Sequence, residues 1–169
     1  KGFEVLIMCD DIDDIVIPAV GKYKDFELKA VNRSGSDEDL GTDKKEAEKK
    51  EQEFGATLVK IKNVLGERVK EVKLSKTLTA ENPSCIVIDE NDPGYQMMQM
   101  MRAMGQEAPE LKPILEVNAD HPIVAKLKDD DSAVNDVAEV LLDQAMLIAG
   151  MSLKEPATFV KAMNTLLSK

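Results

Sequence analysis

The chain has 169 residues, which suits one domain or one domain with part of another, and its hydrophobic content of 43% is ample for a folded core. Its net charge of −10, with both signs spread along the sequence, argues against nucleic-acid binding, because phosphate recognition needs a basic stripe. No apolar run is long enough to span a bilayer, and no signal-peptide pattern is present. We therefore expect a cytoplasmic protein without membrane or nucleic-acid partners.

The first part of the chain has the pattern of an α/β unit. A continuous apolar run at residues 5–9 predicts a strand covered on both faces. Residues 12–20 predict a short helix closed by Gly21, and alternation at residues 26–31 predicts a second strand. Because the chain lacks an initiator methionine and the first strand begins at once, we expect residues 1–33 to be the end of a longer domain.

A second domain is expected after a charged connector. Residues 34–53 contain almost no apolar side chains and predict this connector, and residues 54–169 form the domain itself. Its apolar residues first repeat at helical spacing, and strand-like segments follow. We expect an α+β fold, with a small antiparallel three-stranded sheet, packed helices and a C-terminal helix pair. The helical repeat is Phe54, Leu58, Ile61 and Leu65, closed by Gly66, and the strand segments are residues 72–78, 85–88 and 114–117.

Two amphipathic helices are predicted at the end of the chain, over residues 134–149 and 156–168. Ser152 and Glu155 have capping-box spacing before the second helix, and Pro156 fits its first turn. The helices either fold back on their own domain or meet a second copy in a four-helix bundle. The apolar residues of these faces include Leu141, Leu142, Ala145 and Ile148 in the first helix, and Phe159, Val160, Met163, Leu166 and Leu167 in the second.

Five methionines fall within eight residues, and four of them share one face of a predicted helix. Methionine is flexible and polarizable, so such a row makes a soft surface that can fit many partners. The alternative is a helix facing the core that uses methionine in place of leucine. The four residues of this stripe are Met97, Met100, Met101 and Met104.

Catalytic and metal-binding patterns are weak in this sequence. The aspartates from Asp10 to Asp14 follow a predicted strand, as Mg²⁺ ligands do in phosphotransfer enzymes, but they also fit the first turn of a helix. The only histidine, His121, has no partner for a zinc site, and Cys9 and Cys85 fit buried free thiols. We expect no catalytic, cofactor-binding or metal-binding residues in this chain.

Four segments resemble, in order, the C-terminal part of the heat-shock protein 90 chaperones, in particular the bacterial type. The first is Glu-Val-Leu at residues 4–6, followed by Asp10 and by Ile-Asp-Asp at residues 12–14. The others are Leu-Gly-Glu-Arg-Val-Lys-Glu-Val at 65–72, Glu-Val-Asn-Ala-Asp-His-Pro at 116–122 and Leu-Leu-Asp-Gln-Ala at 141–145.

This resemblance implies that residues 1–33 end a middle domain and that residues 54–169 form a C-terminal dimerisation domain. It further implies that the last two helices form the homodimer interface. Clients of this family, which are unfolded or partly folded proteins, touch an amphipathic helix that matches residues 95–104, Tyr95 included. They also touch a middle-domain segment that matches Asp14 and Ile15, so the methionine stripe becomes a predicted client surface.

The resemblance also assigns functions to parts of the parent protein that this chain lacks. ATP and Mg²⁺ would bind there, so we expect no enzyme activity from this chain. The sequence ends without the Glu-Glu-Val-Asp tail that holds tetratricopeptide co-chaperones, which fits a bacterial protein. Two departures from the family are Ala119, in place of proline, and Ile15, where bacterial relatives often carry tryptophan.

Two other hypotheses stay open at this point. The chain could be a helical adaptor that binds one partner through the methionine helix. It could also be a Mg²⁺-dependent phosphotransfer enzyme that uses the aspartates of residues 10–14.

Overall fold

A computed structural model describes most of the chain, and the described residues fall into two compact units. The first unit combines Lys1–Gly41 with Ile88–Leu111, and the second combines Thr42–Val87 with Lys112–Lys169. The first part of the predicted connector, residues 34–43, lies outside the described residues, and the predicted domain boundaries stay a prediction. Described are residues 4–8, 10, 12–31, 44–76, 78–79, 81–89, 92, 95–107 and 112–168.

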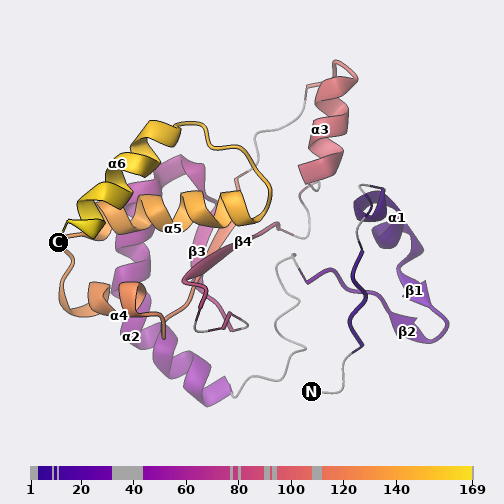
Figure 1. The fold of residues 1–169 in the computed structure, drawn as a ribbon. Coiled ribbons are helices and arrows are strands. Elements are labelled where there is room, and N and C mark those ends of the chain that lie inside the picture. The colour runs from indigo at the N-terminus through magenta and orange to yellow at the C-terminus, as the bar shows by residue number, and fades with distance from the viewer. Residues whose placement is uncertain are drawn as a thin grey trace. The chain divides into compact units, whose positions relative to one another are not determined.

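The second unit contains a three-stranded sheet of β3 (Glu71–Leu74), β5 (Ile114–Val117) and β4 (Ser84–Val87), in that order (Figure 1). β4 runs antiparallel to β5, with Val87 opposite Ile114, whereas β3 runs parallel to β5. The sheet is therefore mixed, and the predicted all-antiparallel sheet is wrong. The central strand β5 separates the two strands that precede it in the sequence, and the apolar pattern of a strand does not encode its direction.

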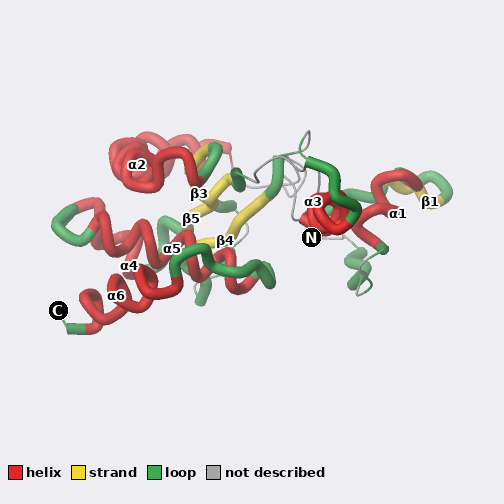
Figure 2. Tube along the Cα trace, turned by 90° about the horizontal axis from the view of Figure 1, so that it is seen from above, coloured by secondary structure: helices red, strands yellow, loops and turns green. Residues whose placement is uncertain are grey.

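Four helices complete the second unit: α2 (Lys44–Leu65), α4 (Pro122–Asp129), α5 (Val134–Ile148) and α6 (Pro156–Leu167). α2 packs against β3 and α5, and α5 packs against β4. Figure 2 shows α6 on the side of α5 that is turned away from the strands, and α6 packs directly on α5.

α5 and α6 begin at their predicted first residues and end one residue before their predicted ends. α5 is followed by Gly150, whose positive φ of 74° ends the helix as a left-handed residue. Pro156 is the first residue of α6, as predicted, but the capping box is wrong, because Glu155 itself occupies the N-cap without a side-chain capping bond. α2 begins at Lys44, inside the predicted connector of residues 34–53 and well before the buried Phe54.

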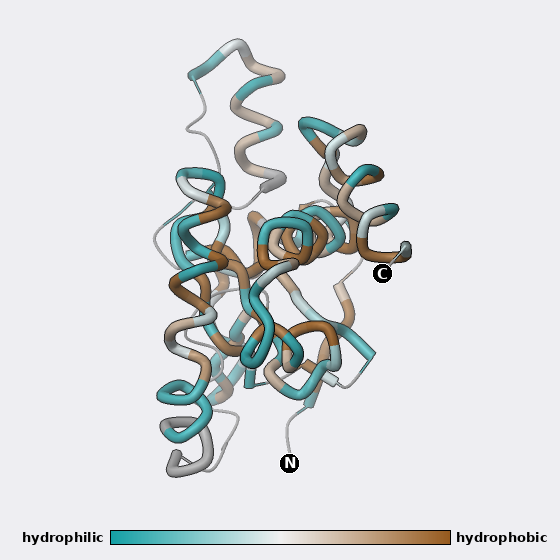
Figure 3. Tube along the Cα trace, turned by 90° about the vertical axis from the view of Figure 1, so that its left-hand side faces the viewer, coloured by the Kyte–Doolittle hydropathy of each residue, from teal (hydrophilic) through white to brown (hydrophobic). Residues whose placement is uncertain are grey.

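The core of the second unit lies between the sheet, α2 and α5. Five large side chains are almost fully buried there, and hydrophobic segments face one another where the elements meet (Figure 3). Burial of such side chains contributes about 1.5 to 3 kcal/mol each, so this cluster is the main source of stability. The five side chains are Ile61, Leu65, Leu115, Leu141 and Leu142.

The first unit contains α1 (Asp13–Val20), a short antiparallel hairpin of β1 (Lys22–Tyr23) and β2 (Phe26–Glu27), and α3 (Tyr95–Ala103). α1 ends at Gly21, whose φ is +66°, as predicted. α1 and α3 contact each other, so this unit joins two segments that are distant in the sequence.

The predicted first strand is not confirmed. Residues 4–8 form no strand and are exposed, while Cys9 lies outside the described residues. A continuous apolar run becomes a buried strand only beside partner strands, and no described strand pairs with it. The second predicted strand, residues 26–31, is confirmed only at its first two residues, which form β2.

Candidate functional site

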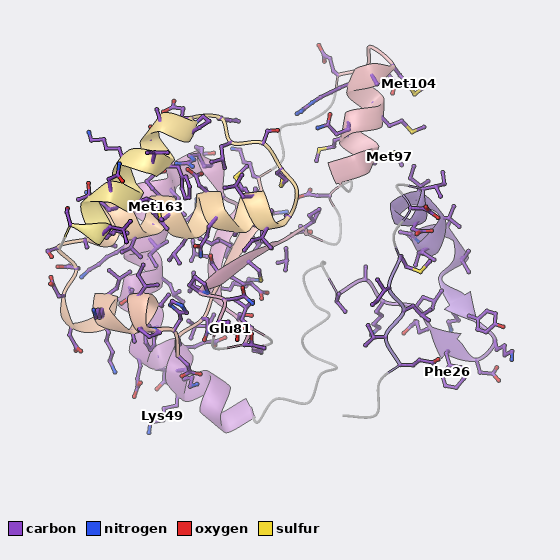
Figure 4. The ribbon with its side chains drawn as sticks, in the orientation of Figure 1. Phe26, Lys49, Glu81, Met97, Met104 and Met163 are labelled. Atoms are coloured by element: carbon purple, nitrogen blue, oxygen red, sulfur yellow. The ribbon has the colours of Figure 1, made fainter. Side chains whose placement is uncertain are left out.

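α3 is partly exposed, and the methionines of residues 97–104 differ in their exposure. Met98 is buried, with only 3% of its surface exposed, and it anchors the helix. Met97, Met100 and Met104 are exposed, the last to 66%, while Met101 is half-buried. Figure 4 shows the side chains of Met97 and Met104 projecting from the helix. Three exposed thioethers thus form what we call the α3 methionine surface.

The other predicted client residues lie in the same unit. Ile15 in α1 is half-buried. The side chains of Asp14 and Tyr95 lie outside the described residues. Because α1 contacts α3, the unit brings together the two segments that the resemblance implied as client contacts.

The predicted dimer face of α5 is divided by the structure. Leu141, Leu142 and Ala145 are buried in the core of their own unit, Leu141 to 0% exposure, where their apolar face packs on the sheet and α2. Their part in a dimer interface stays a prediction. Ile148, at the end of α5, is 70% exposed and remains available.

α6 carries apolar residues on two adjacent faces. Its inner face holds buried Ala162 and partly buried Leu166, which packs against the core. Phe159 and Met163 are half-buried. Val160 and Leu167 are exposed, Leu167 to 78%. These two residues share one face with Asn164 at spacings of four and three residues, and we call Val160, Asn164 and Leu167 the outer face of α6. A shallow depression lies along this helix, lined by Pro156, Ala157, Val160, Lys161, Asn164 and Thr165, with Ser168 at its end.

A polar cluster joins α5 to the turn that follows α2. Arg68, in the 3-10 turn Gly66–Arg68, donates one hydrogen bond to Glu139 Oε2 and another, of 2.8 Å, to Asp143 Oδ1. The Asp143 side chain is only 6% exposed. Its burial raises the pKa of Asp143 above the ordinary value; the charge of Arg68 opposes this rise, and Glu139 and Glu155 add to it.

A second polar contact fixes α5 to β4. The hydroxyl of Ser84 donates a 2.7 Å hydrogen bond to the carbonyl oxygen of Leu141 and accepts one of 3.1 Å from Gln144 Nε2. Sequence reasoning missed both this contact and the Arg68 cluster. Arg68 and Asp143 stand 75 residues apart, so no local spacing relates them, although each lies within one of the segments that carried the resemblance.

Residues considered for catalysis have local structural partners. The backbone N–H of Asp10 donates to Asp13 Oδ2 at 3.0 Å, and His121 Nδ1 accepts from the N–H of Ile123 at the start of α4. The Cys85 thiol is free of a disulfide and donates to Glu116 Oε2 at 3.9 Å. Within the described ranges, no three acidic, cysteine or histidine residues are arranged to hold a metal ion.

Comparison with known proteins decides the family. The family model described as Hsp90 protein matches residues 1–169. The chain belongs to the heat-shock protein 90 family. It is 60% identical to the Chaperone protein HtpG of Treponema denticola, with 99% of this chain and 27% of that protein aligned. It is 51% identical to the protein of the same name from Treponema pallidum and 43% identical to that from Borreliella burgdorferi, over 100% of this chain and 27% of each relative.

These matches confirm the resemblance to Hsp90 chaperones of the bacterial type. The chain spans about a quarter of the length of the curated relatives it matches, since 27% of each is aligned. In the part of the chain that the structure describes, no helix is both long enough and apolar enough to cross a membrane.

The segments that carried the resemblance to Hsp90 also have a structural role. Three of them belong to the second unit and contribute polar side chains that tie its elements together. Arg68 lies in the segment at residues 65–72, Asn118 in that at 116–122, and Asp143 and Gln144 in that at 141–145. These side chains hold α5 against its neighbours and fasten the loop between β3 and β4.

Proposed function

We propose that this chain is the homodimerisation and client-contact part of an ATP-dependent Hsp90 chaperone of the bacterial cytoplasm. In this proposal, residues 1–33 end the middle domain, residues 34–53 connect, and residues 54–169 dimerise. ATP binds with Mg²⁺ and is hydrolysed in parts of the parent protein beyond these residues. The partners of this chain are a second copy of itself and unfolded proteins.

The observation that carries the dimerisation proposal is the apolar outer face of α6. A helix of twelve residues is stabilised mainly by packing, and the inner face already supplies that packing through Ala162 and Leu166. Val160 and Leu167 are additional apolar residues that the fold leaves exposed. Apolar surface of this kind is typical of contacts between subunits, and the last two helices of each copy would form a four-helix bundle.

Replacing both Val160 and Leu167 with aspartate should convert the dimer into a monomer. Two charges would be buried without partners at the centre of the proposed contact, at a cost of several kcal/mol. The helix itself should survive, because exposed positions usually change stability by less than about 0.5 kcal/mol. Sedimentation velocity at micromolar concentration measures the assembly, and far-ultraviolet circular dichroism measures the helix content.

The matched control is Ser152→Asp, which adds a negative charge at an exposed position just before α6. It should leave the dimer intact. A wild-type chain that sediments as a monomer would contradict the proposal, and so would a doubly substituted chain that still dimerises.

The client-contact proposal is supported by the α3 methionine surface. Met98 holds the helix in place, while Met97, Met100 and Met104 stay exposed. Flexible, polarizable side chains adapt to different apolar segments, as a surface for many unfolded partners requires. The contact between α1 and α3 would let both client segments act on one partner.

Replacing Met97, Met100 and Met104 with serine should abolish the binding of unfolded model proteins while the chain stays folded and dimeric. The three side chains are exposed, so each substitution should alter stability by less than about 0.5 kcal/mol. Binding is measured by fluorescence anisotropy of a labelled, permanently unfolded protein, and folding by thermal melting.

Met98→Ala is the internal comparison, because it removes a buried methionine from the same helix. It should cost about 2 to 5 kcal/mol and destabilise α3. The proposal fails if the triple serine variant binds unfolded proteins normally, or if it unfolds as Met98→Ala does.

A further inference from the structure

The guanidinium of Arg68 joins the turn after α2 to two carboxylates on α5. Glu139 and Asp143 are four residues apart, so they lie one turn above the other on the same face of α5. A guanidinium has a rigid planar fork of donors, and here each arm takes one carboxylate. This contact fixes the rotation of α5 about its axis as well as its distance from the turn.

We propose that Arg68 is a positioning residue for the dimer surface, holding α5 in the orientation from which α6 presents its outer face to a second copy. The inference rests on the proposed function, since it concerns the surface through which the chain would dimerise. It assigns to the residues of the 65–72 and 141–145 segments a role in assembly rather than in chemistry.

The charge balance around Asp143 explains why Arg68 is needed. The charged groups that act on Asp143 are Arg68 from the 3-10 turn, Glu139 on α5 and Glu155 at the N-cap of α6. Asp143 thus lies near two other carboxylates, Glu139 on the same helix and Glu155 where α6 begins, and Arg68 is the cation that opposes their repulsion. Because α6 packs on α5, repulsion left uncompensated there would move the two helices relative to each other.

Loss of Arg68 should therefore have an effect that depends on pH. Burial already raises the pKa of Asp143, and removal of the guanidinium would raise it further. A carboxyl group whose pKa is higher in the folded state than in the unfolded state binds a proton on folding, so the fold gains stability as the pH falls through that raised pKa. Mildly acidic pH should then restore the dimer affinity that the substitution of Arg68 removed.

The test measures the dimer dissociation constant of the whole 169-residue chain by sedimentation equilibrium, at neutral and at mildly acidic pH. Arg68→Gln should raise the dissociation constant about tenfold or more at neutral pH, at a temperature where circular dichroism shows both chains folded. At mildly acidic pH the constant should return toward that of the wild type. Arg68→Lys keeps the charge without the fork and should lie between the two.

Two further variants isolate the cause. Asp143→Asn removes the charge that Arg68 compensates. Combining it with Arg68→Gln should therefore lessen the loss of dimer affinity at neutral pH and eliminate the pH dependence of that loss. Glu67→Gln is the matched control, because Glu67 lies in the same turn and pairs with Lys112 at the surface. It should leave the dissociation constant unchanged.

The outcomes separate this inference from the proposed function. A wild-type chain that is a monomer would overturn the proposed function, and this inference with it. A dimeric wild type whose Arg68→Gln variant dimerises equally well, even with a lower melting temperature, would overturn the inference alone. A weakened dimer that mild acid does not restore would also overturn it.

Discussion

Replacing Leu141 with aspartate is expected to unfold the second unit rather than to separate two copies of the chain. The Leu141 side chain, on α5, is completely buried in the core that α5 forms with the sheet and α2. Loss of a buried leucine costs about 2 to 5 kcal/mol, and an unpaired buried charge adds several more. Since domains of this size are stable by only about 5 to 15 kcal/mol, most of the folded population should be lost. Circular dichroism and urea denaturation measure this directly.

Val160→Asp is the comparison for Leu141→Asp, because it places the same charge on an exposed apolar residue of α6. We expect this single variant to keep its unfolding transition and to weaken only the association of copies. If Leu141→Asp gave a folded monomer instead, the assignment of Leu141 to the core of its own unit would be wrong.

The second large effect is expected for Asn118→Ala. The Asn118 amide donates hydrogen bonds to the carbonyl oxygens of Thr79, at 2.9 Å, and Asn82, at 3.2 Å, and its Oδ1 accepts from the N–H of Asp120 at 3.0 Å. The side chain thus fastens the loop between β3 and β4 to the end of β5. Removing three hydrogen bonds from a buried residue should lower the free energy of unfolding by about 2 to 3 kcal/mol.

Asn82→Ala is the control, since Asn82 is exposed and contributes its backbone carbonyl to this contact. It should change the free energy of unfolding by less than about 0.5 kcal/mol. Urea denaturation compares the two variants. Equal effects from both would show that the loop, and not the Asn118 side chain, determines this part of the stability.

Local pattern was sufficient to predict most elements of the second unit. β5 has the predicted bounds, Ile114–Val117, and α5 and α6 end within a residue of their predicted ends. In each case the relevant information is periodicity together with a glycine or proline at the boundary. The α+β class follows from those elements and is confirmed.

Properties that depend on distant partners could not be predicted in the same way. The direction of β3 depends on which neighbour it pairs with, and the run at residues 5–9 lacks a pairing strand among the described residues. An amphipathic pattern shows that Leu141 must be covered, but it does not distinguish the chain's own sheet from a second copy. The contact of Arg68 with Asp143 spans 75 residues and leaves no local signal.

The candidate surfaces were predicted in part. Helical spacing placed Met97, Met100 and Met104 on one face, and the structure leaves all three exposed. Their use by clients stays a prediction. For α6, spacing predicted the helix and its apolar residues. Only the packing of the folded chain shows that Ala162 is buried on the inner face and that Leu167 is exposed on the outer face.

The first unit is built from two chain segments with part of the second unit between them, which constrains the order of events during synthesis. α1 leaves the ribosome well before α3 has been made, and the contact between them cannot form until β3 and β4 have also emerged. Domains generally fold as whole units as the chain emerges, from the N-terminus onward. Here the first unit must wait for its own second segment, which follows part of the second unit in the sequence. Its apolar residues therefore stay uncovered on the nascent chain of a protein whose own family consists of chaperones.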